Sequence, residues 1–237
     1  MNGGKHLTIQ FYDLAGGDLN VRFSPNCWRI RMALWHKGLD FDDIPLRFTD
    51  KEPIAFSGQK LLPVIRDGNR SVHDSWDIAV YLDGAYAEKP RLFNGSQAMA
   101  LCNVLRFWVQ GSVHRAIQRL IIVDIFNALD QRDKAYFRST REARLGMPLE
   151  QFRVATAEGV QELKAALTPA REALQYQPFL SGPAPAFADY LLFGAFMWAR
   201  AVSPVRLLDH GDPVYAWRER MLDLFDGAPR KMAGRGV

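Results

Sequence analysis

The chain has 237 residues, of which 48% are hydrophobic and 12% aromatic, enough to bury a core in one large domain or two small ones and too many for a disordered chain. Its net charge is +4, but basic and acidic residues are interspersed without a long basic run, so we expect no nucleic-acid partner. No stretch approaches 18 uncharged apolar residues and the opening MNGGKHLT lacks an apolar signal region, so we expect a cytoplasmic protein that does not enter a membrane.

The first 86 residues alternate between strand and helix patterns. In chain order they predict a strand over 7–12, a helix from Ser24 to near residue 38, a strand over 41–46, a short helical segment over 50–57, a hairpin over 63–66 and 71–73, and a helix capped by Ser75. The order is therefore βαβ, a connecting helix and ββα. It predicts a right-handed crossover between parallel strands, with the hairpin adding antiparallel strands to the same sheet.

The helix that begins at Ser24 is where we expect the chemistry. Ser24 is a favourable N-cap, and Pro25 suits the first helical position because it needs no backbone N–H there. A helix start offers unpaired N–H groups and a partial positive charge, so an anion beside the Ser24 hydroxyl would be stabilised by both. Taken alone, Ser24 is better explained as a plain helix cap.

The clearest break in the chain lies at residues 87–96, where EKPR is followed by NGS. Beyond it the sequence loses strand-like alternation and predicts helices over 97–127, 130–144, 149–175, 187–202 and 213–225. The expected fold class is α/β plus all-α, with an α/β domain over 1–86, a linker over 87–96 and a helical domain over 97–237.

Two cysteines, Cys27 and Cys102, are too few for a disulfide framework. Both lie in apolar surroundings and are predicted to be buried. No set of cysteines and histidines has the spacing of metal ligands, so we expect no metal site.

Three short motifs in the first domain carry a family resemblance. The Ser24-Pro25-Asn26-Cys27 stretch occupies the place of a thioredoxin-type CxxC with serine first, Leu62-Pro63-Val64 falls where such folds carry a cis-proline, and Asp74-Ser75 starts the next helix. Together they resemble the amino-terminal domain of glutathione transferases. The SPxxWR pattern of 24–29, the DSW of 74–76 and the FADY of 187–190 resemble bacterial LigE-type β-etherases and the related fungal FuA-type serine transferases. The resemblance implies a thioredoxin-like domain followed by a helical domain.

The resemblance also implies a glutathione site. Ser24 would donate a hydrogen bond to the glutathione thiolate, assisted by the amide of Asn26. The remaining contacts would come from residues near the cis-proline and at the second helix start: Lys60 or Gln59 for the glycyl carboxylate, Leu62, Pro63 and Val64 for the cysteinyl peptide, and Asp74 and Ser75 for the γ-glutamyl group. Ser75, like Ser24, can alternatively be a plain helix cap.

A transferase would bind its second substrate, a small apolar aromatic electrophile, where the first long helix of the second domain faces Ser24. Helical spacing places five candidates there: Phe107, Trp108, Gly111, His114 and Arg115. His114 could act as a general acid for a leaving group. The β-etherase resemblance sharpens the expected reaction to cleavage of β-aryl ethers of lignin-derived compounds, and the family implies a homodimer.

Two alternatives stay open. One is a glutathione-dependent thiol reductase using Cys27, and the other is a non-catalytic protein that binds glutathione and aromatic ligands. Related transferases cap the helix at 187 with a polar residue where this chain has Ala186, a change that costs about 1 kcal/mol unless Asp189 compensates.

Overall fold

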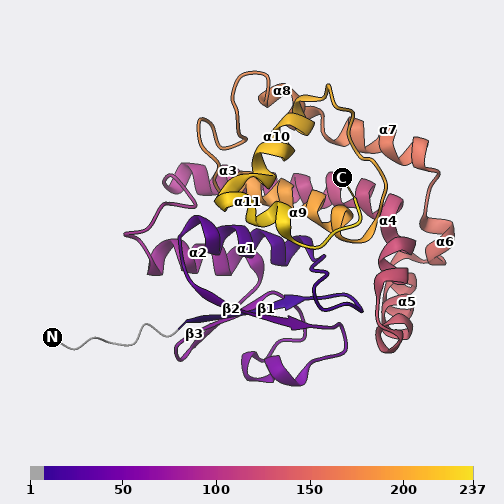
Figure 1. Cartoon of the computed structure of the whole chain (residues 1–237), viewed down its shortest axis with the longest axis horizontal. Coiled ribbons are helices and arrows are strands. Elements are labelled where there is room, and N and C mark those ends of the chain that lie inside the picture. The colour runs from indigo at the N-terminus through magenta and orange to yellow at the C-terminus, as the bar shows by residue number, and fades with distance from the viewer. Residues whose placement is uncertain (1–7, 237) are drawn as a thin grey trace.

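A four-stranded mixed sheet forms from the first part of the chain in the computed structural model, which describes residues 8–236 (Figure 1). The strand order is β2-β1-β3-β4, with β1 (Ile9–Leu14), β2 (Phe41–Leu46), β3 (Val64–Asp67) and β4 (Arg70–His73). Strand β1 pairs in parallel with β2, and β3 pairs antiparallel with both β1 and β4. The predicted βαβ unit and hairpin are thus confirmed. The expected strand start at Leu7 lies outside the described residues, as do residues 1–6 of the N-terminal stretch.

Helices α1 (Pro25–His36) and α2 (Ser75–Ala85) cover one face of this sheet and separate it from the later helices (Figure 1). The short 3₁₀ helix η1 (Glu52–Ser57) lies against the other face, where Ile54 packs in a small buried cluster with Tyr12, Leu46 and Val64. This arrangement is the thioredoxin-like fold that the resemblance implied.

The rest of the described chain is helical, as predicted. Its elements are α3 (Ser96–Trp108), a π-helical turn (Val109–Val113), α4 (His114–Ala128), α5 (Gln131–Leu145), α6 (Leu149–Phe152), α7 (Thr156–Ala166), α8 (Thr168–Ala173), α9 (Phe187–Val202), α10 (Pro213–Leu222) and α11 (Leu224–Lys231). The domain limits of 1–86 and 97–237 stay a prediction.

Three of the expected helices differ from the structure. The helix expected over 213–225 ends at Leu222, and residues 225–227 have positive φ. The helix expected over 97–127 contains the π turn, and the one expected over 149–175 is divided into α6, α7 and α8. Helices α6 and α7 are separated at Val154, whose N–H bonds to the C=O of Arg119 and not to a carbonyl of α6. The second division occurs at the start of α8, where Pro169 occupies the first turn and supplies no N–H.

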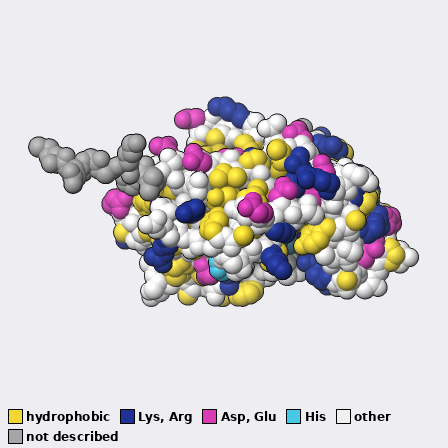
Figure 2. Space-filling view, turned by 90° about the horizontal axis from the view of Figure 1, so that it is seen from below, with side chains coloured by type: hydrophobic (Ala, Val, Ile, Leu, Met, Phe, Trp, Pro, Cys, Tyr) yellow, Lys and Arg dark blue, Asp and Glu magenta, His cyan; other side chains and the backbone are white. Residues whose placement is uncertain are grey.

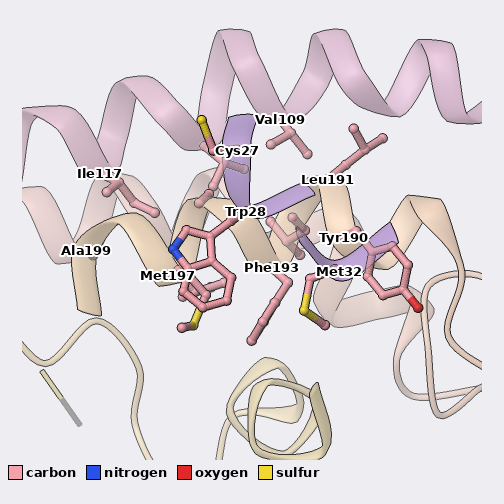
Figure 3. Close-up of a cluster of buried hydrophobic side chains, with 14 of the residues drawn as sticks. Cys27, Trp28, Met32, Val109, Ile117, Tyr190, Leu191, Phe193, Met197 and Ala199 are labelled. Carbon is pink, nitrogen blue, oxygen red and sulfur yellow. The ribbon is translucent and has the colours of Figure 1, made fainter. Parts of the chain in front are cut away.

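Helices α1 and α9 pack closely against each other and join the two parts of the molecule (Figure 3). The Trp28 ring lies edge-on to Phe193, with centroids 6.3 Å apart. A Cβ atom added at Gly194 would lie 2.4 Å from the carbonyl oxygen of Pro25, closer than real contacts allow. Glycine at 194 therefore permits the first turn of α1 to rest directly on α9.

Asp189 anchors the segment that leads into α9. Its buried carboxylate accepts hydrogen bonds from the backbone N–H of Ala186, Leu180 and Ser181 and from the Trp217 indole, at distances of 2.7 to 3.1 Å. Asp189 thus supplies the half of a capping box that the third helical residue can supply, while the Phe187 N–H at the helix start bonds to the Leu92 carbonyl at 3.2 Å.

Basic and acidic side chains are interspersed over the face seen from below in Figure 2, in keeping with the sequence pattern. Within residues 8–236, none of the helices has the length and hydropathy to cross a bilayer.

Candidate active site

Ser24 is the N-cap of α1 and lines a cavity. Its Oγ accepts a hydrogen bond from the Cys27 N–H at 3.3 Å, and its side chain is 6% exposed. A hydroxyl has one donor besides its two acceptor lone pairs, so the Ser24 O–H stays available for an acceptor in the cavity. The cap and the catalytic interpretation of Ser24 are therefore compatible.

The loop that leads to Ser24 is held by buried side chains. The Trp28 indole donates to the C=O of Arg22 at 2.8 Å. The Arg22 guanidinium in turn donates to Asp43 on β2 at 3.1 Å, and Arg31 of α1 bridges Asp43 and Asp13 at 2.7 and 2.6 Å. These contacts tie the start of α1 to strands β1 and β2 and fix the position of the Ser24 hydroxyl.

The cavity has a volume of about 460 Å³ and lies between the sheet domain and the helical domain. Four of the expected glutathione residues line it: Ser24, Asn26, Lys60 and Leu62. The Asn26 N–H, in the first turn of α1, makes no hydrogen bond within the described chain, so an N–H donor accompanies the Ser24 hydroxyl there. Lys60 is exposed, and its carbonyl accepts a hydrogen bond from Lys51 at 2.6 Å.

The other expected glutathione residues lie outside the cavity lining. The peptide bond between Leu62 and Pro63 is cis, as predicted, and Val64 begins β3. The prediction that Ser75 caps α2 is wrong. Asp74 is the N-cap, with φ of 64° and its carboxylate accepting from the Trp76 N–H at 2.8 Å, because a short acidic side chain tolerates that left-handed backbone. Ser75 is the first helical residue and is buried.

The π turn between α3 and α4 decides which residues of that long helix face the cavity. Gln110, His114 and Arg115 line it. By contrast, Phe107 is 59% exposed, Gly111 is exposed, and Trp108 packs against the apolar core, all three outside the lining. A π turn holds an extra residue, so the face that regular helical spacing assigns to Phe107 and Gly111 is rotated away from the cavity.

His114 is neutral in the folded protein. Its Nε2 lies 3.3 Å from a guanidinium nitrogen of the buried Arg29, which can only donate, so the ring proton resides on Nδ1. Burial and the adjacent Arg29 charge lower the pKa of His114 to about 3, and burial lowers the pKa of Arg29 to about 10 against the opposing Asp74 carboxylate. This environment disfavours the expected role of His114 as a general acid, because the ring carries no acidic proton at neutral pH.

Helix α5 supplies a wall of the cavity that the sequence analysis missed. Its lining residues are Tyr136, Phe137, Arg141 and Arg144, and Phe48 faces them from the loop after β2. Asp133 of α5 holds that loop, since its carboxylate accepts from the N–H of Phe48 at 3.1 Å and from Thr49. Residues 136, 137, 141 and 144 share one helical face, but helical spacing alone does not show that this face lines a cavity.

Both cysteines are buried and unpaired. Burial raises the pKa of Cys27 well above its ordinary value and that of Cys102 to about 11. Neither thiol lines the cavity, and both environments disfavour a reactive thiolate. Among residues 8–236, no cluster of three or more histidine, cysteine or acidic side chains is arranged to hold a metal ion.

Two features define the class of fold. One is a thioredoxin-like domain whose helix-capping serine lines the cavity, and the other is the helical domain that completes that cavity. The model for the glutathione S-transferase N-terminal domain matches residues 23–85, and the model for the glutathione S-transferase C-terminal domain matches residues 100–221. The chain therefore belongs to the glutathione S-transferase family, whose cosubstrate is glutathione.

Relatives in fungi are similar over most of the chain. The glutathione S-transferase-like protein ustS of Aspergillus flavus is 25% identical over 89% of this chain and 82% of its own length. The crystal structure of glutathione transferase GSTFuA2 from Phanerochaete chrysosporium matches with a TM-score of 0.75 and 28% identity, covering 93% of both chains. That of CsGST63524 of Ceriporiopsis subvermispora, in complex with glutathione, matches with a TM-score of 0.75 and 24% identity over 95% of both chains.

Proposed function

We propose that this protein is a serine-type glutathione transferase that activates the glutathione thiol for attack on an aromatic electrophile. The observation that carries the proposal is the Ser24 hydroxyl, which lines the cavity at the start of α1, accepts from the Cys27 N–H and retains one donor for a ligand. A free thiol has a pKa of about 8.5, and a hydrogen bond to a charged group contributes about 1.5–3 kcal/mol, equivalent to about one to two pKa units. One such bond makes much of the thiol ionised near neutral pH.

The remaining glutathione contacts are proposed from the same motifs. Lys60 would pair with the glycyl carboxylate and the backbone at Leu62 with the cysteinyl peptide, while Asp74 and Ser75 would hold the γ-glutamyl group. Asn26 adds an N–H donor beside the thiolate. The nucleophile thus lies beside the lining residues of the first domain, and the electrophile binds against those of the helical domain.

In the proposed reaction the thiolate attacks a carbon that bears an aryloxy group next to an aromatic ketone. A carbon–sulfur bond forms, the carbon–oxygen bond breaks, and the electron pair leaves on the phenolate, which takes a proton from water. Holding both reactants together and stabilising the thiolate supply most of the acceleration. The neutral His114 is not assigned a proton-transfer step.

Turnover of a β-aryl ether ketone, followed by release of its phenol with and without glutathione, tests this proposal. Phenol is expected only with glutathione, and Ser24→Ala should reduce its rate roughly ten- to a hundredfold, the value of one charged hydrogen bond. Binding of glutathione without phenol release would reject ether cleavage and favour a ligand-binding protein. Loss of activity in Cys27→Ala, with Ser24→Ala unaffected, would favour a thiol reductase, which the burial of Cys27 argues against.

A further inference from the structure

The charged side chains that line the cavity are all cationic. Five cationic side chains line it: Lys51, Lys60, Arg115, Arg141 and Arg144. No aspartate or glutamate of residues 8–236 is in the lining. None of these five cations forms a salt bridge within the described chain, although eighteen such contacts occur elsewhere in it.

Glutathione alone does not balance this charge. It has two carboxylates and one amine, so it carries one net negative charge as a thiol and two as a thiolate. Lys60 and its neighbour Lys51, whose ammonium is bonded to the Lys60 carbonyl, lie beside the glutathione motifs. The three arginines belong instead to the helical domain, on α4 and α5. They remain without an anionic partner after glutathione is accounted for.

Arg141 is held in place by aromatic rings and not by an acid. Its guanidinium carbon lies 4.9 Å from the Phe48 ring centroid and 4.7 Å from that of Phe137, and one nitrogen donates to Thr140 at 2.9 Å. Burial and the nearby charge of Arg144 lower the pKa of Arg141. A bound anion would offset both the burial of the Arg141 charge and its repulsion from Arg144. A guanidinium presents a fork of donors that matches a carboxylate.

The acids on the same helix are already bonded elsewhere, Glu142 to Arg138 at 2.8 Å. Asp133 is fully buried, and both of its oxygens already accept bonds from Phe48 and Thr49. Apolar and aromatic side chains complete the cavity around the arginines, among them Phe48, Tyr136 and Phe137. The wall therefore combines flat rings with unpaired guanidinium groups, a surface complementary to a ring that carries a carboxylate.

We propose that the second substrate of this cavity is an aromatic carboxylate, whose ring packs against Phe48, Tyr136 and Phe137 and whose carboxylate binds Arg141 and Arg144, with Arg115 nearby. This inference rests on the proposed function and refines it, since the sequence alone indicated an uncharged apolar aromatic. It makes Arg141 and Arg144 determinants of substrate specificity.

Isothermal titration with biphenyl-4-carboxylate and with its neutral amide, in the presence of S-methylglutathione, tests the proposal. The carboxylate is expected to bind at least about tenfold more tightly than the amide, with the difference shrinking as salt is raised. Arg141→Met and Arg144→Met should each weaken the carboxylate while leaving the amide nearly unchanged, and Arg141→Lys should retain part of the preference. Arg141 packs on two rings, so its replacement can also lower the stability of the fold. Arg144 is exposed, and Arg144→Met is therefore the variant expected to fold normally.

Arg132→Met is the matched control, because Arg132 lies on the same helix, outside the cavity lining and paired with Asp130. It should keep the full preference. Equal binding of carboxylate and amide, failure of both to bind, or a preference that survives Arg141→Met combined with Arg144→Met would each overturn the proposal. A titration with S-methylglutathione alone reports separately on the proposed function, and the carboxylate preference can be measured even if that titration shows no binding.

Discussion

Arg29 of α1 donates a hydrogen bond to Nε2 of His114 of α4 across 3.3 Å, so a buried cation of the first domain fixes the tautomer of a cavity residue of the second. Burial, together with the charge of Arg29, lowers the pKa of His114 and leaves the ring facing the cavity without a charge. The contact also makes the ring a hydrogen-bond acceptor towards Arg29 and a donor only through Nδ1.

Replacing His114 by glutamine tests this protonation state. The folded-state pKa of His114, about 3, lies below its ordinary value of 6.5. Above pH 6.5 the ring is neutral in both states, so it adds no pH dependence. As the pH falls towards about 3, only the unfolded chain binds the proton, and the free energy of unfolding decreases by up to about 1.4 kcal/mol per pH unit.

His114→Gln should lack that decrease. Chemical denaturation at about pH 7 and about pH 5 should therefore show the wild-type protein losing more stability than the variant as the pH falls. Parallel losses in the two proteins would show that His114 titrates normally and that the Arg29 contact does not govern it.

Gly194→Ala should move the start of α1. The added methyl group would meet the Pro25 carbonyl at 2.4 Å, and relieving such a clash costs about 1–3 kcal/mol. Since Pro25 follows Ser24, the same shift should reduce turnover as well as stability. Gly84→Ala is the control, because its added Cβ meets nothing within 4 Å. Its free energy of unfolding, measured by thermal unfolding, should change by less than about 1 kcal/mol.

A Gly194→Ala protein as stable and as active as the Gly84→Ala control would show that α1 and α9 can separate without cost.

Cys27→Ala should leave turnover nearly intact and cost about 1 kcal/mol of stability through lost packing. Burial raises the pKa of the Cys27 thiol, so neither it nor the buried Cys102 should react with a thiol reagent in the folded protein. Labelling before and after unfolding measures this directly. Rapid labelling of folded Cys27 would reopen the reductase interpretation.

Most of the fold was predictable because its signals are local. The cap at Ser24, the alternation that predicts the first strand and the break before Ser96 each depend on a few neighbouring residues, and the predicted elements follow. The cap of α2 was assigned one residue too late, since Ser75 and Asp74 both favour N-caps and only the backbone conformation distinguishes them.

The far wall of the cavity was not predictable from local signals. The π turn changes the helical phase between Phe107 and His114, and regular spacing cannot reveal it. The arginines of α5 line the cavity opposite Phe48, and Asp133 of the same helix binds the loop that carries Phe48, a contact between residues far apart in the chain. The sequence of α5 has the pattern of an ordinary charged helix.

The central claim is that the Ser24 hydroxyl stabilises the glutathione thiolate. The most direct measurement is the pKa of the thiol of bound glutathione, followed by the ultraviolet absorbance of the thiolate, in the wild type, Ser24→Thr and Ser24→Ala. The wild type and the threonine variant, which both keep a hydroxyl and a cap, should show a pKa about one to two units below the free value of about 8.5. Ser24→Ala, checked for folding by thermal unfolding, should return it close to that value, whereas the same lowered pKa in all three proteins would contradict the account.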